Sequence, residues 1–394
     1  MRHTPARRVV EEAAAHTGEA KGVAVAGSEG KAGDSRPVSS RSLAGGDSAS
    51  TTSRPDMKDK PRQVAPGVYM LEAPFSLGLE SRNGESLTLC YLVQQADGWL
   101  MVDSGYNDRG CYDALCHQLD ALGISLRDIR CLVITHYHPD HSGLASLIKA
   151  ASGARVVIHQ DDWNVLHNIV GSSEEWNIHG LIPWVSSLGV PPAEIEGFRQ
   201  MATFGRALFP MGLEVDTLLQ GEESPIGDSG HLRAILTPGH SPGHICIYDE
   251  RNKVLFSGDH ILVEITPHIS PSHLTSRDQL RQYLDALRKV QHLDVDLVLP
   301  AHERPFDHLS HRVDEILDHH SKRLEEVLEA LFGQMLSPWD IAHRVEWAVG
   351  KWDQMDATNR VLAVRETVAH LQLLEQRGQV SPVERDGVNL YRLA

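Results

Sequence analysis

A short block of metal-type ligands constrains this chain more than any other feature of its 394 residues. The block reads Thr135-His136-Tyr137-His138-Pro139-Asp140-His141 and follows an apolar segment, residues 131–134, that has the composition of a buried strand. Imidazole and carboxylate groups are the usual zinc-type ligands, and a loop lets alternate residues diverge toward two ions. Such a density of ligands at a strand end is hard to explain by packing, so we predict a metal site.

Further residues with ligand chemistry follow later segments that also read as strands. They are His240, Asp259 and His302, and each comes after an apolar run and a small or turn-forming residue. This placement predicts that they join the first block on one rim of a sheet. Any one of these histidines alone could be an ordinary surface residue, but their ordered co-occurrence argues against that reading for the set.

The apolar pattern around these residues predicts a layered α/β sandwich, because an antiparallel start is followed by alternating strands and helices. Strands are expected at 68–71, 87–93, 99–102, 131–135, 155–159, 245–248, 254–257 and 295–300, and helices at 112–122 and 144–151. Residues 160–222 carry aromatic side chains at mostly helical spacing, which predicts a helical insertion that covers one face of the main domain.

The chain divides into three expected parts. Residues 1–60 are rich in Ala, Gly, Ser and Thr, which predicts a disordered tail. Residues 61–310 form the main domain. Residues 311–394 show three helical patterns, at 313–332, 338–349 and 359–377, and then a hairpin signal, which together predict a small winged-helix-like domain. Within that domain, the acidic surroundings of His311, His319 and His320 predict that these side chains are solvated.

Charge and cysteine content limit the partners and the compartment. The net charge is −16, and residues 311–394 carry ten Lys or Arg side chains against fourteen Asp or Glu, so we expect no binding of duplex DNA. No apolar run approaches the roughly 20 residues that span a bilayer, so no membrane partner is expected. The five cysteines form no CxxC motif, which predicts a cytoplasmic protein without a disulfide framework. The C-terminal part could also mediate a homodimer.

On these residues the sequence resembles the metallo-β-lactamase superfamily over residues 63–302. Five ordered motifs carry the resemblance: Asp103 in Val102-Asp103-Ser104-Gly105, the block at 136–141, His240, Asp259 and His302. It implies an α/β fold of the αββα sandwich type with two zinc ions per chain, iron or manganese being the alternatives. In such a site His136, His138 and His240 would hold one metal, and Asp140, His141 and His302 the other. Asp259 would bridge the two, and Asp103 would support the ligands by hydrogen bonds.

Hydrolysis is the reaction that such a centre implies, because two ions share a water, lower its pKa and polarise the scissile bond. The bridging hydroxide would attack, and Asp140 would accept or shuttle the proton as the catalytic residue. The resemblance disfavours β-lactam hydrolysis, since Asp259 stands where the main zinc β-lactamases carry Cys. It favours a small ester, thioester or lactone as the substrate.

Three other functions stay open at this point. A metal-dependent nuclease or phosphodiesterase could use the same ligands, although the overall acidity of the chain disfavours a nucleic-acid substrate. A mononuclear iron persulfide dioxygenase can share part of the ligand set, and a non-catalytic binding protein could retain the scaffold. Near the ligands, His260 and His268 could line the pocket or donate to an oxyanion, and Tyr137 could touch substrate or pack under the loop.

Overall fold

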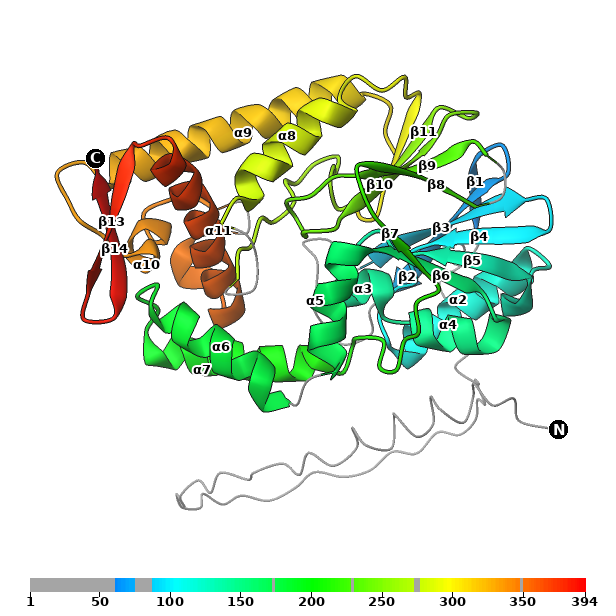
Figure 1. The fold of residues 1–394 in the computed structure, drawn as a ribbon, viewed down its shortest axis with the longest axis horizontal. Coiled ribbons are helices and arrows are strands. Elements are labelled where there is room, and N and C mark those ends of the chain that lie inside the picture. The colour runs from blue at the N-terminus through cyan, green and yellow to red at the C-terminus, as the bar shows by residue number, and fades with distance from the viewer. Residues whose placement is uncertain (1–60, 75–86, 172–173, 228–229, 273–276, 348–349) are drawn as a thin grey trace, which may run out of the picture. The chain divides into compact units, whose positions relative to one another are not determined.

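The computed structural model describes residues 61–74, 87–171, 174–227, 230–272, 277–347 and 350–394, so the predicted disordered tail at 1–60 lies outside the described residues. The first sheet has seven strands in chain order (Figure 1). They are β1 (Arg62–Ala65), β2 (Val68–Pro74), β3 (Leu87–Gln95), β4 (Gly98–Val102), β5 (Ile129–Val133), β6 (Arg155–His159) and β7 (Thr217–Leu219). Pairing is antiparallel from β1 to β4 and parallel from β4 to β7.

The second sheet has five strands in the order β12-β11-β10-β9-β8. These strands are β8 (Glu223–Ile226), β9 (Leu232–Leu236), β10 (Ile245–Asp249), β11 (Val254–Gly258) and β12 (Leu297–Pro300). The two sheets pack face to face through a shared apolar cluster that draws residues from both. Within it the rings of Tyr91 and Phe256 meet edge to face at 5.4 Å, and the Tyr91 hydroxyl donates to the carbonyl of Pro300 at 2.6 Å.

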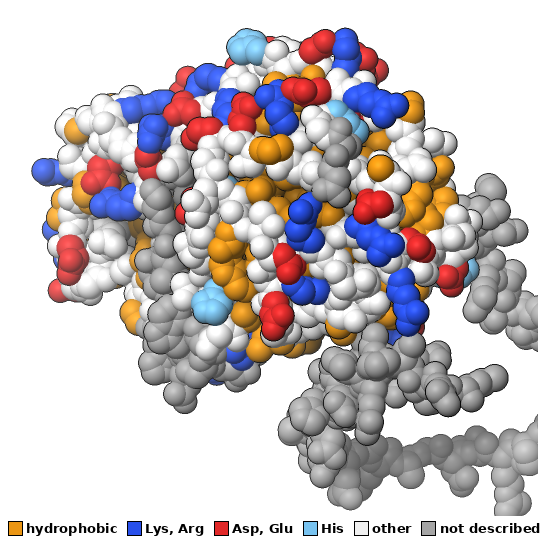
Figure 2. Space-filling model, turned by 45° about the vertical axis from the view of Figure 1, so that its right-hand side comes forward, with side chains coloured by type: hydrophobic (Ala, Val, Ile, Leu, Met, Phe, Trp, Pro, Cys, Tyr) orange, Lys and Arg blue, Asp and Glu red, His pale blue; other side chains and the backbone are white. Residues whose placement is uncertain are grey.

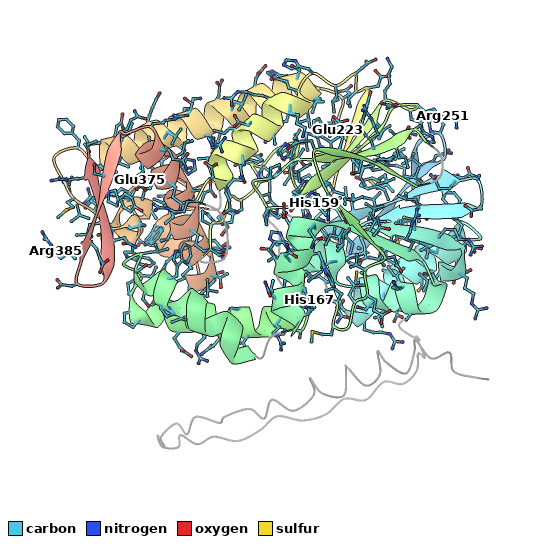
Figure 3. All side chains as sticks on the ribbon, in the orientation of Figure 1. His159, His167, Glu223, Arg251, Glu375 and Arg385 are labelled. Carbon is cyan, nitrogen blue, oxygen red and sulfur yellow. The ribbon has the colours of Figure 1, made fainter. Side chains whose placement is uncertain are left out.

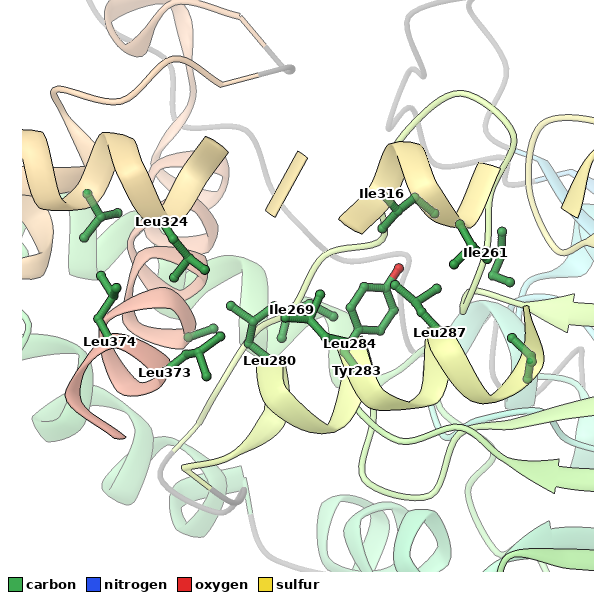
Figure 4. Packing of buried hydrophobic residues seen from close by; sticks show 14 of the residues in the cluster. Ile261, Ile269, Leu280, Tyr283, Leu284, Leu287, Ile316, Leu324, Leu373 and Leu374 are labelled. Carbon is green, nitrogen blue, oxygen red and sulfur yellow. The ribbon is translucent and has the colours of Figure 1, made fainter. Parts of the chain in front are cut away.

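Helices cover the outer face of each sheet. On the first sheet lie α2 (Arg109–Ala121), α4 (Ala145–Ser152) and α5 (Gln160–Gly171), while α3 (Pro139–Ser142) is a single turn within the ligand block. On the second sheet lie α8 (Gln279–Val290) and α9 (Leu309–Ala330), and Figure 4 shows Tyr283 and Leu287 of α8 facing Ile316 of α9 in their common core. These layers confirm the αββα sandwich that the sequence predicted.

The predicted insertion packs against the C-terminal helices at its far end. Its helices α6 (Glu174–Ser186) and α7 (Pro192–Arg206) share an apolar cluster with α10 (Pro338–Ala342) and α11 (Ala357–Gln376), and Figure 1 shows all four side by side. Val185 and Phe198 of the insertion meet Val361 and Val364 of α11 in that cluster. The insertion therefore connects the sheet domain to the C-terminal helices.

The C-terminal part contains three helices and the hairpin of β13 (Val380–Arg385) and β14 (Val388–Leu393), in the predicted order. Its core is continuous with the outer face of the second sheet, so its description as a winged-helix-like domain stays a prediction. The helix expected at 338–349 ends at Ala342, whose carbonyl accepts a hydrogen bond from the indole N–H of Trp347, and residues 348–349 of that expected helix lie outside the described residues.

One expectation for α9 is wrong. His320 was expected to be solvated, but its side chain is fully buried because it lies on the same helix face as Val313, Ile316 and Leu324. Its Nδ1 lies 3.1 Å from Nε2 of His370 on α11. Across the described residues, no helix combines the length and apolarity that crossing a bilayer requires.

Candidate metal centre

All the predicted ligands lie at one edge of the sandwich because the strands before them end there. The ligand block follows β5, whose parallel neighbours are β4 and β6, so Asp103 after β4 comes to the same edge. In the second sheet β11 and β12 are also parallel, and Asp259 and His302 follow their ends. The backbone N–H of Ile245 donates to the carbonyl of Thr135 at 3.0 Å and joins the two sheets at this edge.

The first group of candidate ligands consists of His136, His138 and His240. Nδ1 of His138 lies 2.9 Å from Nε2 of His136 and 3.0 Å from Nε2 of His240. Ligand atoms about 2.1 Å from a tetrahedral ion lie roughly 3.3 Å from one another, so these nitrogens are close to the spacing that a single ion requires. His138 thus turns its Nδ1 inward, whereas the other two histidines present Nε2.

The second group consists of Asp140, His141 and His302. Oδ2 of Asp140 lies 3.3 Å from Nε2 of His141 and 3.2 Å from Nε2 of His302. All three side chains offer one ligand atom within 4.8 Å of the others, as they do in the first group. Two groups of metal-type ligands therefore lie side by side at the strand ends, and a third set of ligand atoms, from His136, His141 and Asp259, connects them.

Asp259 stands between these groups and turns one carboxylate oxygen to each. Oδ2 lies 3.5 Å from Nε2 of His240 and 4.0 Å from Nε2 of His136. Oδ1 lies 3.5 Å from Nε2 of His141 and 3.4 Å from Nε2 of His302. A carboxylate in this position can bridge two cations, which is the role that the resemblance implied.

The far sides of the histidine rings are hydrogen-bonded, which orients the inward nitrogens. Nδ1 of His240 donates to the carbonyl of His268 at 2.8 Å, and Nδ1 of His302 donates to the carbonyl of Leu87 at 2.8 Å. Nδ1 of His136 lies 3.2 Å from Oγ1 of Thr135. Each of these rings therefore has its Nε2 available toward the centre.

Asp103 contacts the second group on the side of the His141 ring that faces away from the ligand atoms. Its Oδ2 accepts hydrogen bonds from Nδ1 of His141 and from Oγ1 of Thr135, both at 2.8 Å, and its Oδ1 accepts from the Thr135 backbone N–H at 2.8 Å. Asp103 has a φ of 59°, a left-handed conformation that Asp tolerates better than most residues. The structure thus places Asp103 in contact with a candidate ligand, although outside both ligand groups.

The charges of this centre support binding of cations. Burial alone would raise the pKa of Asp140, but the neighbouring His141 and His302 hold it below its usual range, so the carboxylate is ionised at neutral pH. Among the described residues, Nε2 of His141 and Oδ1 of Asp259 are buried polar atoms with no hydrogen-bond partner. Buried polar atoms are nearly always paired, so an arrangement of ionised carboxylates and unpaired ligand atoms fits divalent metal ions.

Two residues that the sequence reasoning did not assign to the centre lie against it, and the first is Asp162. Its buried carboxylate accepts hydrogen bonds from the Tyr137 N–H at 2.8 Å and from the Ser241 hydroxyl at 2.7 Å, and it also accepts from the Gly243 N–H. It therefore connects the ligand block to the loop of His240. Figure 3 labels His159, where β6 ends and α5 begins, three residues before Asp162. An acidic residue just beyond a strand at the ligand edge was the available signal.

Tyr106 was also missed, although it follows the Asp103 motif closely. Burial raises the pKa of this phenol, and the charges of Asp140 and Asp259 raise it further, so its hydroxyl remains protonated. A protonated hydroxyl near two carboxylates of the centre can act as a hydrogen-bond donor. Its position after a strand at the ligand edge could have marked it as a pocket residue.

The three predicted pocket residues lie in different surroundings. His260 is fully buried between the rings of His244 and Tyr283, and burial lowers its pKa to about 3, so it lies behind the centre as a neutral group. His268 is partly exposed and its Nδ1 pairs with Glu366 of α11 at 2.7 Å. Tyr137 is half-buried with its ring edge to face on His138 at 4.6 Å.

Comparisons with known proteins find one matching family model and several relatives. A family model described as the metallo-beta-lactamase superfamily matches residues 83–302. The chain is 24% identical over 294 residues to a probable metallo-hydrolase, YqjP, of Bacillus subtilis, a match that covers 73% of this chain and 87% of that protein. It is 31% identical over 100 residues to an atrochrysone carboxyl ACP thioesterase of Aspergillus fumigatus, a match limited to 25% of this chain and 29% of that protein.

Solved structures show the same fold. A metallo-beta-lactamase family protein from Thermus thermophilus superposes with a TM-score of 0.70 at 26% identity, covering 84% of this chain and 100% of that one. A beta-lactamase domain protein from Burkholderia ambifaria superposes with a TM-score of 0.68 at 24% identity, covering 85% and 95%. Both matches cover a larger share of this chain than residues 83–302, which the family model matches.

Proposed function

Because the chain belongs to the metallo-beta-lactamase superfamily, as the sequence resemblance indicated, we propose that it is a dinuclear zinc hydrolase of small ester, thioester or lactone substrates. The metal-dependent hydrolase class follows from the family and from its metallo-hydrolase relative. The two zinc ions, the substrate class and the residue roles are our proposal. The observation that carries it is Asp259, whose two oxygens face two separate ligand groups.

In this proposal each ligand group holds one ion. His136, His138 and His240 would hold the first, Asp140, His141 and His302 would hold the second, and Asp259 could contribute one carboxylate oxygen to each. Two ions bound there would activate a shared water near neutral pH and polarise the bond to be cleaved. A site that held a single ion would leave one complete ligand group without a role, which is why we favour hydrolysis over the one-iron dioxygenase chemistry.

The protein supplies proton transfer and orientation. The carboxylate of Asp140 is the proton acceptor in our proposal. Because its pKa is lowered, the carboxylate is deprotonated at neutral pH and is free to accept a proton. Asp103 fixes the tautomer of His141 by accepting from its Nδ1. The raised pKa of Tyr106 keeps its hydroxyl protonated, so in this proposal it could donate to a developing negative charge on a carbonyl oxygen.

A carbonyl substrate suits the charge of the protein better than a nucleic acid does. The chain is acidic overall, and on the face shown in Figure 2 the Lys and Arg side chains are interspersed with Asp and Glu. Binding of a phosphate backbone requires a concentration of basic side chains. The relative named as an ACP thioesterase supports a thioester among the candidates. We therefore propose a small-molecule substrate, and a cytoplasmic location because all five cysteines are free thiols.

The test combines metal analysis with a substrate panel. Protein purified without added metal is analysed for metal content and assayed on an aryl ester, a thioester, a lactone, a β-lactam, a phosphodiester and an RNA. We expect about two zinc ions per chain and turnover of a carbonyl ester that Asp140→Ala abolishes. Asp113→Ala, which removes an exposed carboxylate of α2, is the matched control and should keep full activity. About one iron per chain with no hydrolysis of any panel member would overturn the proposal.

A further inference from the structure

The segment after β11 contributes to the centre at two points. It begins with Asp259, and nine residues later the carbonyl of His268 accepts the hydrogen bond from Nδ1 of His240. Residues 259–272 contain neither helix nor strand. Their conformation therefore depends on side chains from other elements that contact them.

Helix α11 makes three of these contacts with two adjacent residues. Oε2 of Glu366 lies 2.7 Å from Nδ1 of His268. Arg365 donates from Nε to the carbonyl of Pro271 at 2.9 Å and from Nη2 to the carbonyl of Ser270 at 3.0 Å. The stretch 268–271 is thus held at three of its residues from one turn of a single helix.

The contact of Glu366 with His268 is the shortest of the three. The Glu366 side chain is 11% exposed, and a carboxylate so far from water is stable only when it is paired. Burial acts to raise the pKa of Glu366, but His268 and the nearby His370 and His320 lower it to about 2, so the group is ionised. Since the ring and the carbonyl belong to one residue, fixing the His268 ring restricts the carbonyl that His240 uses.

His240 differs in this respect from three other candidate ligands, His136, His141 and His302. The partners of His136, His141 and His302 are Thr135, Asp103 and the carbonyl of Leu87, which lie in or directly beside the strands of the first sheet. The partner of His240 lies in a segment without secondary structure. Its orientation therefore depends on whatever holds residues 268–271.

We propose that Glu366, with Arg365, is a positioning residue of the metal centre that holds His240 in its ligand orientation through residues 268–271. This inference rests on the proposed function, because it assigns the C-terminal helix a role in a centre that binds metal. It predicts that α11 affects the ion held by His136, His138 and His240 and leaves the other ion unchanged. A helix that only packed against the segment would affect folding stability without changing metal affinity.

The experiment measures zinc affinity directly. Zinc is titrated into metal-free wild-type protein, Glu366→Ala and Glu366→Gln in competition with a chromophoric chelator, and the cobalt-substituted proteins are compared by absorption spectroscopy. Glu194→Ala is the matched control, because Glu194 forms a partly buried ion pair with Arg360 of the same helix at 2.6 Å but connects it to α7. The thermal midpoints of the metal-free proteins report their folding.

We expect Glu366→Ala to weaken one of the two zinc sites about 10-fold to 100-fold, with an altered cobalt spectrum. Glu366→Gln keeps an oxygen that can accept from His268 and should recover part of that affinity, and Glu194→Ala should bind both ions as the wild type does. If Glu366→Ala does not fold, Glu366→Gln and Arg365→Gln provide the comparison.

Two outcomes would contradict the inference in different ways. Folded Glu366 variants that bind both zinc ions with wild-type affinity would overturn the positioning role and leave the proposed function intact. A wild-type protein that binds no divalent ion would instead overturn the proposed function. The wild-type titration therefore separates the two failures before any variant is measured.

Discussion

The backbone N–H of Asp259 donates to Nε2 of His244 across 3.1 Å, directly behind the carboxylate that faces both ligand groups. Since Nε2 accepts this bond, Nδ1 of His244 carries the proton and donates to Oγ1 of Thr237 at 2.9 Å. Burial is the main reason that the pKa of His244 lies well below its usual value, which keeps the ring neutral and in this arrangement. His244 lies outside both groups of candidate ligands, yet it orients the residue that joins them.

Replacement of His244 by Phe should weaken metal binding. The aromatic ring fills similar space but leaves the Asp259 N–H without its acceptor, so we expect zinc affinity to fall about 10-fold to 100-fold. The free energy of unfolding of the metal-free protein should fall by about 1–3 kcal/mol because a buried donor loses its partner. Chelator competition and denaturant unfolding measure the two effects. His167→Phe, at an exposed position of α5 labelled in Figure 3, is the control, and equal behaviour of the two variants would refute the prediction.

Gly258 should not tolerate a side chain. Its φ is +51°, and a Cβ there would lie 2.7 Å from Nε2 of His244 and 3.1 Å from Cβ of Thr135. Gly258→Ala should therefore lower the free energy of unfolding by more than its backbone strain alone would. It should also reduce the zinc content, because the new methyl group displaces His244. Gly378→Ala is the matched control, because Gly378 has a φ of +67° with no atom near its Cβ position. Comparable loss of stability and unchanged zinc content in both variants would show that the contact is unimportant.

Removal of the Asp162 carboxylate should loosen the ligand block relative to the loop of His240. Asp162→Ala leaves the N–H of Tyr137, the N–H of Gly243 and the Ser241 hydroxyl without an acceptor, so we expect a loss of about 2–4 kcal/mol in the free energy of unfolding. Thermal and denaturant unfolding test this. Asp161→Ala, at the exposed neighbouring position, should change stability by less than about 0.5 kcal/mol. A loss of the same size at both positions would contradict our account of Asp162.

The pair of His320 and His370 should make folding sensitive to acid. Burial lowers the pKa of His370 to about 4 from its usual 6.5, so the unfolded chain binds a proton more readily than the folded one between these values. The neutral His370 ring contributes its full share to the free energy of unfolding above pH 6.5. This contribution is lost as the pH falls toward 4. The nearby charges are those of Glu366, which raises the pKa, and Arg323, which lowers it.

The corresponding measurement compares metal-free wild-type protein with His370→Leu by denaturant unfolding at about pH 7 and about pH 4.5. The wild type should lose about 2–3 kcal/mol more than the variant over this interval, from roughly 1.4 kcal/mol for each unit of pKa difference. His311→Leu, which changes an exposed histidine of α9, should keep the wild-type pH dependence. Parallel pH profiles of wild type and His370→Leu would rule out this group as a source of acid sensitivity.

The fold and the ligand groups could be predicted because the sequence patterns that indicate them lie within single short segments of the chain. Each candidate ligand follows an apolar run, and strand ends gather at one sheet edge whatever the exact register. The supporting residues carry no comparable signal. Asp162 and His244 matter because the two sheets meet in a particular register, in which Asp162 reaches Ser241 and His244 reaches Asp259. The position of Asp162 just beyond a strand was a weak signal, because a polar residue at such a position does not reveal which residues of the other sheet it contacts.

Long-range packing explains the remaining differences from the sequence predictions. The acidic neighbours of His320 indicated a solvated side chain, but α9 packs against α8 and α11 along one face, and His320 lies on that face. The helix expected at 338–349 stops early, at Ala342, whose carbonyl accepts a hydrogen bond from the indole N–H of Trp347. Both outcomes depend on contacts between segments, which apolar periodicity within a single segment does not contain.

The distribution of the ligands along the chain has a consequence for biosynthesis. His136, His138 and His240 are all synthesised before Asp259 and His302, and the last of these comes from the strand end that closes the second sheet. The residues that orient His240 come later still, because His268 follows Asp259, and Glu366 of α11, which pairs with His268, follows His302. We therefore expect the centre to retain metal ions only after α11 has been synthesised and has folded onto residues 268–271.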